Sequence, residues 1–242
     1  MKGIILSAGQ GSRLLPLTAT MPKCLVEVGG ASILDHQLHA LAAAGMGEAV
    51  IVGGYRIGQI AEHLEAARPP LPTRLVFNPF WAVASSIGSV WAARPHLDGD
   101  FCLMNGDTVF DAAVIADAGK RAEEGVSLLI DPVERLEPDD MRVAFDHGLV
   151  GDVAKHLAEE ATTHRSLGVI LARGAGSDRY RTGLETVIAG PNGTMAYHHA
   201  IIAHIAREGM VHGIVNRGGC WREVDRPEDI ESWMHDHEAA AR

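Results

Sequence analysis

The chain of 242 residues is poor in aromatic residues, in cysteine and in long apolar runs, and each shortage excludes a class of protein. Its cysteines, Cys24, Cys102 and Cys220, are odd in number and far apart, which argues against a disulfide framework and favours a reducing compartment. No stretch approaches the roughly 18 consecutive apolar residues of a membrane span, and the apolar start is too short for a secretory signal. We therefore expect a cytoplasmic protein without a membrane partner.

The sequence also lacks an excess of positive charge. The formal net charge is −10 at pH 7 and the isoelectric point is about 5.7, which excludes the basic surface typical of a nucleic-acid-binding protein. The only lysines are Lys2, Lys23, Lys120 and Lys155. A strongly anionic ligand would therefore need local help from single cationic side chains, backbone amides or metal ions.

Apolar residues, by contrast, make up 47% of the chain, and they form short runs separated by amphipathic segments. Short β-branched runs that end at polar or glycine positions are typical of strands buried on both faces. Their alternation with helical segments predicts βαβ units around a mainly parallel sheet. In the first half we expect strands at 2–6, 49–52, 75–77, 101–104 and 126–130. We expect helices at 57–67, 86–93 and 112–124, and one that Ser32 caps and Gly45 ends.

The alternation stops after Asp131. Residues 141–145 and 149–153 flank a His-Gly turn and predict a hairpin, and further strands are expected at 166–171, 211–215 and 221–224. Helices are expected at 179–188 and 196–207, and a last one near Pro227, a residue that suits the first turn of a helix. No internal repeat or long linker divides the chain, so we predict a single α/β domain over residues 1–242.

The first predicted strand is followed by a glycine-rich turn that also contains Arg13 and Lys23, which a turn alone would not require. The stretch is Gly9-x-Gly11-x-Arg13-x-x-Pro16-x-Thr18-x-x-x-Pro22-Lys23-x-Leu25. Such a turn presents backbone N–H groups to phosphate oxygens, although a lone GxG is also compatible with an ordinary tight turn. The dinucleotide fingerprint is excluded because Leu14 stands where its third glycine belongs, and the GxxxxGK phosphate loop is absent.

This string resembles the signature of the nucleotidyltransferases that join a nucleoside triphosphate to a phosphorylated sugar or alcohol. The resemblance implies a Rossmann-like α/β/α sandwich of GT-A type, with a nucleotide-binding half at about 1–130 and an acceptor-binding half at about 131–242. It also implies that Arg13 and Lys23 are the catalytic residues, because fixed cations stabilise the charge that develops when the α-phosphorus is attacked. The nucleotide-binding residues implied in and near the loop are Leu6, Ala8, Gly9, Gly11, Ser12 and Gly106.

Acidic residues follow two of the predicted strands. Asp107 lies beyond the carboxyl end of the strand 101–104, where α/β proteins place ligands, and Glu223 and Asp225 share one face of the strand 221–224. Taken alone, Asp107 also fits a local turn and Asp225 also fits a helix cap. The resemblance implies that Asp107 and Asp225 bind Mg²⁺, with Glu223 as an additional ligand in the cytidylyltransferase branch, and carboxylates suit that ion.

The segment that contains Asn78, Ser85 and Ser86 occupies the base-reading position of this family. It lacks the glycine-rich stretch of sugar-1-phosphate members and is more similar to the phosphocholine cytidylyltransferase-like branch, which implies CTP as the donor. That branch carries paired asparagines where this chain has Ser85 and Ser86, so the base and acceptor contacts there stay open. Lys155 matches a lysine that contacts the phosphate of the acceptor, and by itself also fits a solvated lysine after a hairpin.

We therefore expect an Mg²⁺-dependent cytidylyltransferase that transfers CMP to a small phosphorylated or phosphonate acceptor. Phosphocholine, inositol phosphate, another polyol phosphate and an aminophosphonate all stay open. A quaternary ammonium would need an aromatic cage, for which the candidates are Trp81, Trp91, Tyr180 and Tyr197.

The alternatives are a sugar-1-phosphate uridylyl- or thymidylyltransferase and a non-catalytic nucleotide-binding regulator. The only macromolecular partner expected is a second copy of the chain, in a homodimer. The histidine pairs His36 and His39, and His198 and His199, lack the flanking pattern of a zinc site, and we expect them on helix surfaces.

Overall fold

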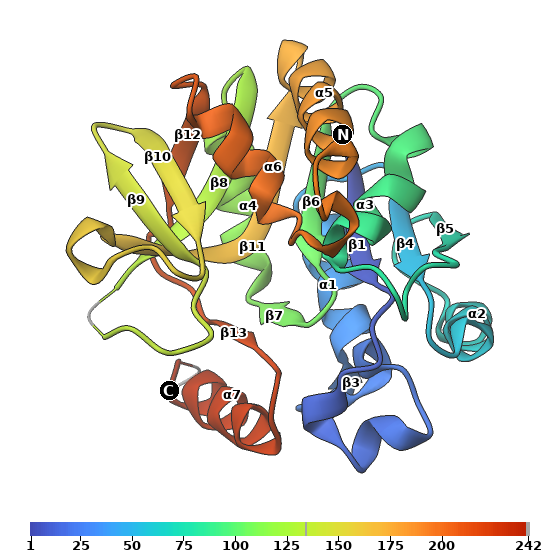
Figure 1. The fold of residues 1–242 in the computed structure, drawn as a ribbon. Helices are drawn as coiled ribbons and strands as arrows, with labels where there is room; N and C mark the ends of the chain where they lie inside the picture. The colour runs from blue at the N-terminus through green and yellow to red at the C-terminus, as the bar shows by residue number, and fades with distance from the viewer. Residues whose placement is uncertain (134, 241–242) are drawn as a thin grey trace.

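A nine-stranded sheet forms the centre of the computed structural model, which describes residues 1–133 and 135–240 (Figure 1). The strand order is β5-β4-β1-β6-β11-β8-β12-β10-β9. In that order, the strands are Thr73–Phe77, Ala49–Gly53, Lys2–Ser7, Phe101–Asn105, His164–Arg173, Gly125–Pro132, Val211–Val215, Leu149–Ala154 and Arg142–Asp146.

The sheet is mixed, and most of its parallel pairings lie in the region of predicted βαβ units, whereas β12, from the second half of the chain, also pairs in parallel with β8. The strands β5, β4, β1 and β6 all pair in parallel. The strand β11 lies antiparallel between β6 and β8, and β9 and β10 form the predicted hairpin. The antiparallel pairings therefore involve the strands that follow Asp131, where the alternation of strands and helices stops.

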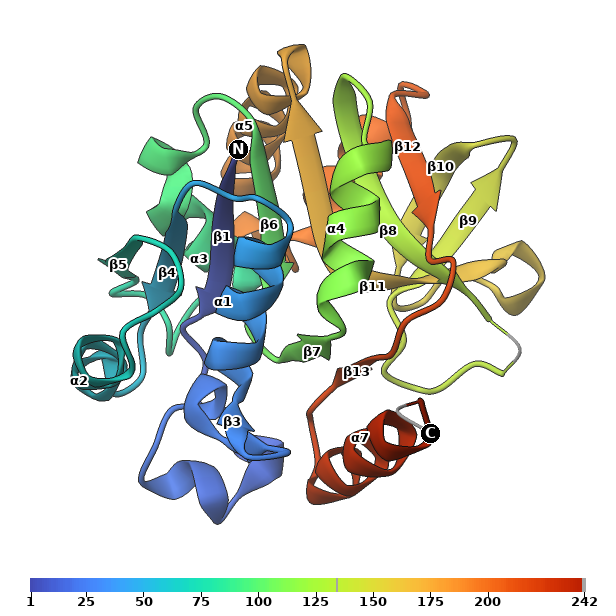
Figure 2. The same ribbon diagram turned by 180° about the vertical axis from the view of Figure 1, so that it is seen from behind.

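Helices cover both faces of this sheet, which confirms the α/β/α sandwich. Figure 1 shows α3, α5 and α6 on one face, and Figure 2 shows α1 and α4 on the other. Neighbouring residues of a strand point to opposite faces, so Ile4 packs with the first group of helices and Ile5 with the second, both fully buried. The helices α1 to α7 span Ile33–Ala43, Ile57–Ala67, Ser86–Ala93, Ala112–Arg121, Ala175–Ala189, His199–Ala206 and Pro227–Ala240.

A third, smaller core fastens the C-terminal segment to the N-terminal one. Leu14, Val109, Val224 and Trp233 are buried together there, with α7 beside the segment that follows β1 (Figure 1). Two short ladders support the contact: β13 pairs with β7, and β2 pairs with β3. These strands span Trp221–Glu223, Thr108–Phe110, Glu27–Val28 and Ala31–Ser32.

Several element boundaries differ from the sequence prediction. The helix α5 begins at Ala175, four positions before the predicted start, and α6 begins only at His199, since Ala196 has an extended backbone after the separate 3₁₀ turn at 193–195. Asn192, which precedes that turn, is left-handed with a φ of 58°, and this conformation separates the turn from α5. The 3₁₀ turns are Ser12–Leu14, Leu17–Ala19, Lys23–Leu25, Arg94–His96, Glu159–Ala161 and Gly193–Met195. In the described part of the chain, no helix has both the length and the apolar character needed to cross a membrane.

Candidate active site

A cavity of about 420 Å³ opens at the carboxyl ends of β1 and β6. These strands are adjacent and parallel, with Leu6 opposite Asn105, so the loops that follow them emerge side by side. This is the edge at which open α/β sheets bind ligands. Every residue predicted for the site lines this one cavity, although their chemical roles stay predictions. They are Leu6, Ala8, Gly9, Gly11, Ser12, Arg13, Lys23, Asn78, Ser85, Ser86, Gly106, Asp107, Lys155, Glu223 and Asp225.

The spacing of the glycine-rich stretch has a geometric reason. Gly11 is left-handed with a φ of +74°, and a Cβ on it would lie 2.8 Å from Cβ of Lys23. The hydroxyl of Thr18 donates to the Gly11 carbonyl at 2.7 Å. The chain thus folds back on itself between Gly11 and Lys23, and this packing places the Lys23 side chain in the cavity.

Gly106 is needed for the close approach of the two strand ends, and replacing it with alanine tests this. A Cβ there would lie 2.4 Å from the Leu6 carbonyl oxygen, so we expect Gly106→Ala to lower the free energy of unfolding by about 1–3 kcal/mol. Denaturant unfolding measures the change. The matched control is Gly58→Ala in α2, where nothing lies within 4 Å of the added Cβ and stability should be unchanged or higher. Equal effects of the two substitutions would contradict the assignment.

The centre of the site is the ammonium group of Lys23, which lies between two aspartates. Its Nζ donates to Oδ2 of Asp107 at 2.9 Å and to Oδ1 of Asp225 at 2.5 Å. Burial by itself lowers the pKa of Lys23, but the two carboxylates outweigh it and the pKa is raised. The pKa of Asp225 is lowered, because Lys23 and Arg13 outweigh the opposing effect of burial. Lys23 is therefore a buried cation at neutral pH.

Glu223 lies deeper in the same group of acids. Burial, together with the negative charges of Asp107 and Asp225, raises the pKa of Glu223 to about 8. Its Oε1 is 3.5 Å from the amide nitrogen of Asn105, and Oδ1 of Asp107 is buried without a hydrogen-bond partner in the described part of the chain. Near neutral pH Glu223 is therefore largely protonated, and a divalent cation would favour its ionised form and supply the partner that Oδ1 of Asp107 lacks among the described residues.

No metal site is already assembled among the described residues, since no three His, Cys, Asp or Glu side chains converge as ligands there. The Lys23 ammonium contacts both predicted aspartate ligands instead. The donor set nevertheless fits Mg²⁺, because all three acidic side chains offer carboxylate oxygens to the same cavity. Asp225 is not the cap of α7; the side chain of Asp229 accepts the backbone N–H groups of Asp225 and Arg226 instead.

Asp139 belongs to the cavity although it was not predicted as a site residue. The guanidinium of Arg13 donates to Asp139 at 3.2 Å and to Asp225 at 2.6 Å. The side chains of Lys155 and Arg226 each lie 3.7 Å from the Asp139 carboxylate. Asp139 therefore gathers three cations from distant parts of the chain. No motif in the sequence singled out Asp139, because its partners Arg13 and Arg226 are distant along the chain.

The predicted base-reading segment is held by Asn78. Its buried amide donates to the Ser89 hydroxyl at 3.1 Å and accepts the backbone N–H of Phe80 at 2.9 Å. Of the four candidates for an aromatic cage, only Trp81 and Tyr197 line the cavity. Tyr180 is buried in the core against Phe101, and Trp91 packs against the guanidinium of Arg94.

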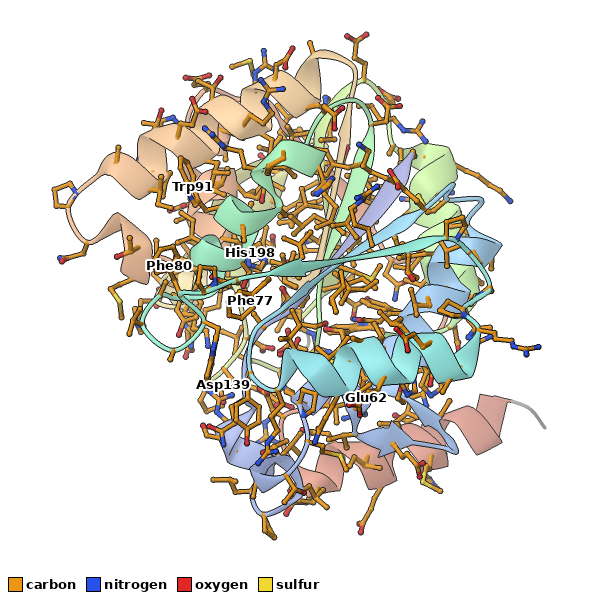
Figure 3. All side chains as sticks on the ribbon, turned by 90° about the vertical axis from the view of Figure 1, so that its right-hand side faces the viewer. Glu62, Phe77, Phe80, Trp91, Asp139 and His198 are labelled. Atoms are coloured by element: carbon orange, nitrogen blue, oxygen red, sulfur yellow. The ribbon has the colours of Figure 1, made fainter. Side chains whose placement is uncertain are left out.

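The prediction that His198 and His199 lie on a helix surface was wrong. Both are buried, and both line the cavity at the start of α6 (Figure 3 labels His198). Their burial is tolerated because each ring is hydrogen-bonded to a serine hydroxyl. Nδ1 of His198 lies 3.1 Å from Oγ of Ser86, and Nε2 of His199 lies 2.9 Å from Oγ of Ser166. Helical periodicity missed them because α6 is buried on most of its surface.

The two histidines predict a loss of stability in mild acid. Burial lowers the pKa of His198 to about 4 and that of His199 well below its ordinary value of 6.5. The unfolded chain takes up these protons as the pH falls through about 6.5, whereas the folded protein does not. The free energy of unfolding should therefore be highest above pH 6.5 and should decline towards pH 4, by about 3 kcal/mol for His198 alone.

Urea unfolding across this pH range measures how steeply the free energy of unfolding falls with pH. His199→Gln removes one of the titrating groups and should flatten it, whereas His147→Gln, at a side chain that is 93% exposed, should leave it unchanged. Parallel curves for the wild type and His199→Gln would contradict the prediction.

Comparison with known proteins places this chain in a family. Residues 3–172 match the MobA-like NTP transferase domain. The chain is 28% identical over 235 residues to CMP-5'-(3-aminopropyl)phosphonate synthase of Streptomyces rubellomurinus, which covers 95% of this chain and 37% of that protein. It is 31% identical over 158 residues to a UTP–glucose-1-phosphate uridylyltransferase of Haloferax volcanii, covering 63% of this chain and 64% of that protein. The chain thus spans less than two thirds of the length of either relative.

The fold has a solved counterpart. The structure of CTP:phosphocholine cytidylyltransferase from Streptococcus pneumoniae superposes with a TM-score of 0.79 at 20% identity. The match covers 97% of this chain and 98% of that one. At 20% identity, this similarity shows a shared fold.

Proposed function

Because the chain belongs to the family of MobA-like NTP transferase domains, we propose that it is a cytidylyltransferase that transfers CMP from CTP to a small phosphorylated or phosphonate acceptor. The observation that carries the proposal is the arrangement of Lys23 and Arg13 against Asp107 and Asp225, at the end of the glycine-rich loop. The name of the relative that aligns over 95% of the chain, a CMP-phosphonate synthase, supports CTP as the donor.

In the proposed reaction an oxygen of the acceptor's phosphate or phosphonate attacks the α-phosphorus of CTP. The bond between the α-phosphorus and the bridging oxygen breaks, and pyrophosphate leaves with the electron pair. No side chain has to act as a nucleophile or base, because the attacking oxygen is already ionised near pH 7. The chain therefore contributes position and charge: backbone N–H groups near Gly9 and Gly11 face the phosphates, and Arg13 and Lys23 neutralise the developing charge.

The acidic residues and Lys155 complete this assignment. Mg²⁺, held by Asp107 and Asp225 with Glu223, would neutralise phosphate oxygens in the same site. Lys155 is the proposed contact of the acceptor's phosphate, since it lines the cavity and its ammonium forms a longer ion pair with Asp139 at 3.7 Å. Acceptor and nucleotide would then be bound from opposite halves of the chain.

A pyrophosphate-release assay tests the proposal. The purified protein is incubated with CTP, UTP, ATP, GTP or dTTP, each against phosphocholine, inositol-1-phosphate, 2-aminoethylphosphonate, glycerol-3-phosphate and glucose-1-phosphate, with Mg²⁺ or with EDTA. Release that requires CTP, Mg²⁺ and one of the acceptors other than glucose-1-phosphate is the expected result. Binding of CTP without any release would identify a nucleotide-binding regulator instead.

A uridylyltransferase acting on a sugar-1-phosphate is the second candidate, favoured by the 31% identity to the uridylyltransferase of Haloferax volcanii. The same assay separates the two, because release with UTP and glucose-1-phosphate, and not with CTP, would replace the proposed function.

A further inference from the structure

A buried glutamine of α1 holds the turn that contains Asp107. Gln37 is 0% exposed, and its side-chain nitrogen donates to the carbonyl oxygens of Asn105 at 2.5 Å and of Thr108 at 2.9 Å. Because both partners are acceptors, the nitrogen of the amide and not its oxygen must face them. The two carbonyls lie on either side of Gly106 and Asp107 in the sequence, and α1 packs beside β7 here (Figure 2). Gln37 therefore closes the turn between β6 and β7 from the core side.

Stability alone does not explain an amide at this position. Leu34 and Leu41, which lie on the same face of α1 as Gln37, are fully buried in an apolar core. The amide oxygen of Gln37, Oε1, is buried without a hydrogen-bond partner among the described residues, and such an atom is costly. A methionine of equal length would avoid this cost but would leave the two carbonyls of the turn without their donor. The contact with the turn is thus what distinguishes glutamine from an apolar residue here.

The turn is the common reference for all three acidic side chains proposed to hold Mg²⁺. It contains Asp107 itself. Thr108 pairs with Glu223 in the ladder between β7 and β13. The carbonyl of Asp107 accepts the backbone N–H of Val224 at 2.9 Å, and Asp225 is the next residue. A displacement of the turn would therefore change where the three carboxylates stand relative to one another.

The placement of these carboxylates matters because Mg²⁺ binds its ligands in a strict geometry. It requires near-octahedral oxygen atoms at about 2.0–2.1 Å, so its affinity falls when a ligand is displaced. The turn is also held by backbone contacts, such as the Gly106 N–H that donates to the Leu6 carbonyl at 3.1 Å. Those contacts do not depend on the side chains. Gln37 is therefore the member of this framework that a substitution can remove.

We propose that Gln37 is a positioning residue for the Mg²⁺ site, because its amide fixes the turn 105–108 and so sets the spacing of Asp107, Glu223 and Asp225. Gln37 touches neither the metal nor a substrate, since it is fully buried and does not line the cavity. The inference rests on the proposed function, and it adds to the site a residue that lies outside the cavity.

The test measures how much Mg²⁺ strengthens the binding of CTP in the absence of an acceptor. Isothermal titration calorimetry gives the Kd for CTP with Mg²⁺ and with EDTA, and the ratio of the two constants reports the contribution of the metal. Gln37→Met should reduce this ratio about 10- to 100-fold and leave the Kd in EDTA unchanged. Gln37→Asn, one methylene shorter, keeps an amide that cannot reach both carbonyls and should give an intermediate loss.

Arg173→Met is the matched control. The guanidinium of Arg173 also binds two backbone carbonyls, those of Gly119 at 2.6 Å and of Ala122 at 2.8 Å. The neighbouring Ala172 pairs with Phe101 at the start of β6, so Arg173 lies at the edge of the sheet opposite the cavity. Arg173→Met should lower the melting temperature without changing the effect of Mg²⁺ on the binding of CTP.

The outcomes separate this inference from the proposed function. A wild-type ratio in Gln37→Met would overturn the inference and leave cytidylyl transfer standing. An equal loss in Arg173→Met would do the same, because the effect would then follow stability and not position. A wild-type protein that neither binds CTP nor releases pyrophosphate from it would overturn the proposed function and the inference together. Thermal unfolding identifies a variant that fails to fold, and if this is Gln37→Met, the ratio in Gln37→Asn decides by the same criterion.

Discussion

Replacing Lys23 with methionine should lower kcat/KM for pyrophosphate release about 100- to 1,000-fold. Methionine retains the apolar stem but removes the cation that Asp107 and Asp225 hold in the cavity. The reaction then loses a fixed positive charge at the place where negative charge is proposed to develop, and water cannot replace it without reorganising. Steady-state pyrophosphate release with CTP and the preferred acceptor measures the effect.

The same substitution should also lower the free energy of unfolding, because it leaves two carboxylates without their shared partner. The loss should stay below the roughly 3–5 kcal/mol typical of a broken buried ion pair. The aspartate side chains are 32% and 25% exposed, so water can solvate them in part. The matched control is Lys120→Met, at an exposed lysine of α4, which should change neither activity nor stability. Activity close to wild type in Lys23→Met would remove Lys23 from the mechanism.

Replacing Asp107 with asparagine should lower kcat about 1,000-fold in the presence of Mg²⁺ while the fold stays intact. Asparagine has the shape of aspartate, and its carbonyl oxygen can still accept the hydrogen bond from Lys23. What is lost is one negative charge and the oxygen Oδ1, which is buried without a hydrogen-bond partner among residues 1–133 and 135–240. Pyrophosphate release over a range of Mg²⁺ concentrations measures the change, and raising Mg²⁺ should not restore the rate.

Thermal stability distinguishes this result from simple unfolding. Asp107→Asn removes one of the two carboxylates that stabilise the buried Lys23 ammonium, but it also removes a charge that repels Glu223, so we expect its melting temperature to fall only slightly. Asp117→Asn, at a surface ion pair with Arg121 in α4, is the control for loss of an aspartate charge. Normal Mg²⁺-dependent turnover in Asp107→Asn would refute the assignment of Asp107 as a metal ligand.

Much of the fold could be predicted from the sequence because it depends on local residue patterns. Short β-branched runs between amphipathic segments predicted the strands β1, β4, β5, β6 and β8 to within a few residues. Ser32 caps α1 as predicted, and Asp35, three positions further on, completes a capping box with it. The chain direction that βαβ units impose then placed the loops after β1 and β6 at one edge of the sheet.

The local patterns failed where long-range packing decides the outcome. The antiparallel position of β11, between β6 and β8, has no counterpart in its own sequence, because an apolar strand fits either direction. The burial of His198 and His199 was missed for a similar reason. A histidine is polar in a periodicity argument, and only the folded chain supplies the serines that make it compatible with the interior.

The sequence alone therefore determined the βαβ framework, the glycine-rich loop and the residue types of the site. Only the tertiary structure decided that these residues meet. Lys23 and Asp225 are 202 positions apart, and they touch because the small core around Leu14, Val224 and Trp233 fastens the C-terminal segment beside the first loop. The physical reason is that spacing and turn chemistry act over a few residues, whereas contact between distant segments follows from burial of apolar surface that no single segment can achieve alone.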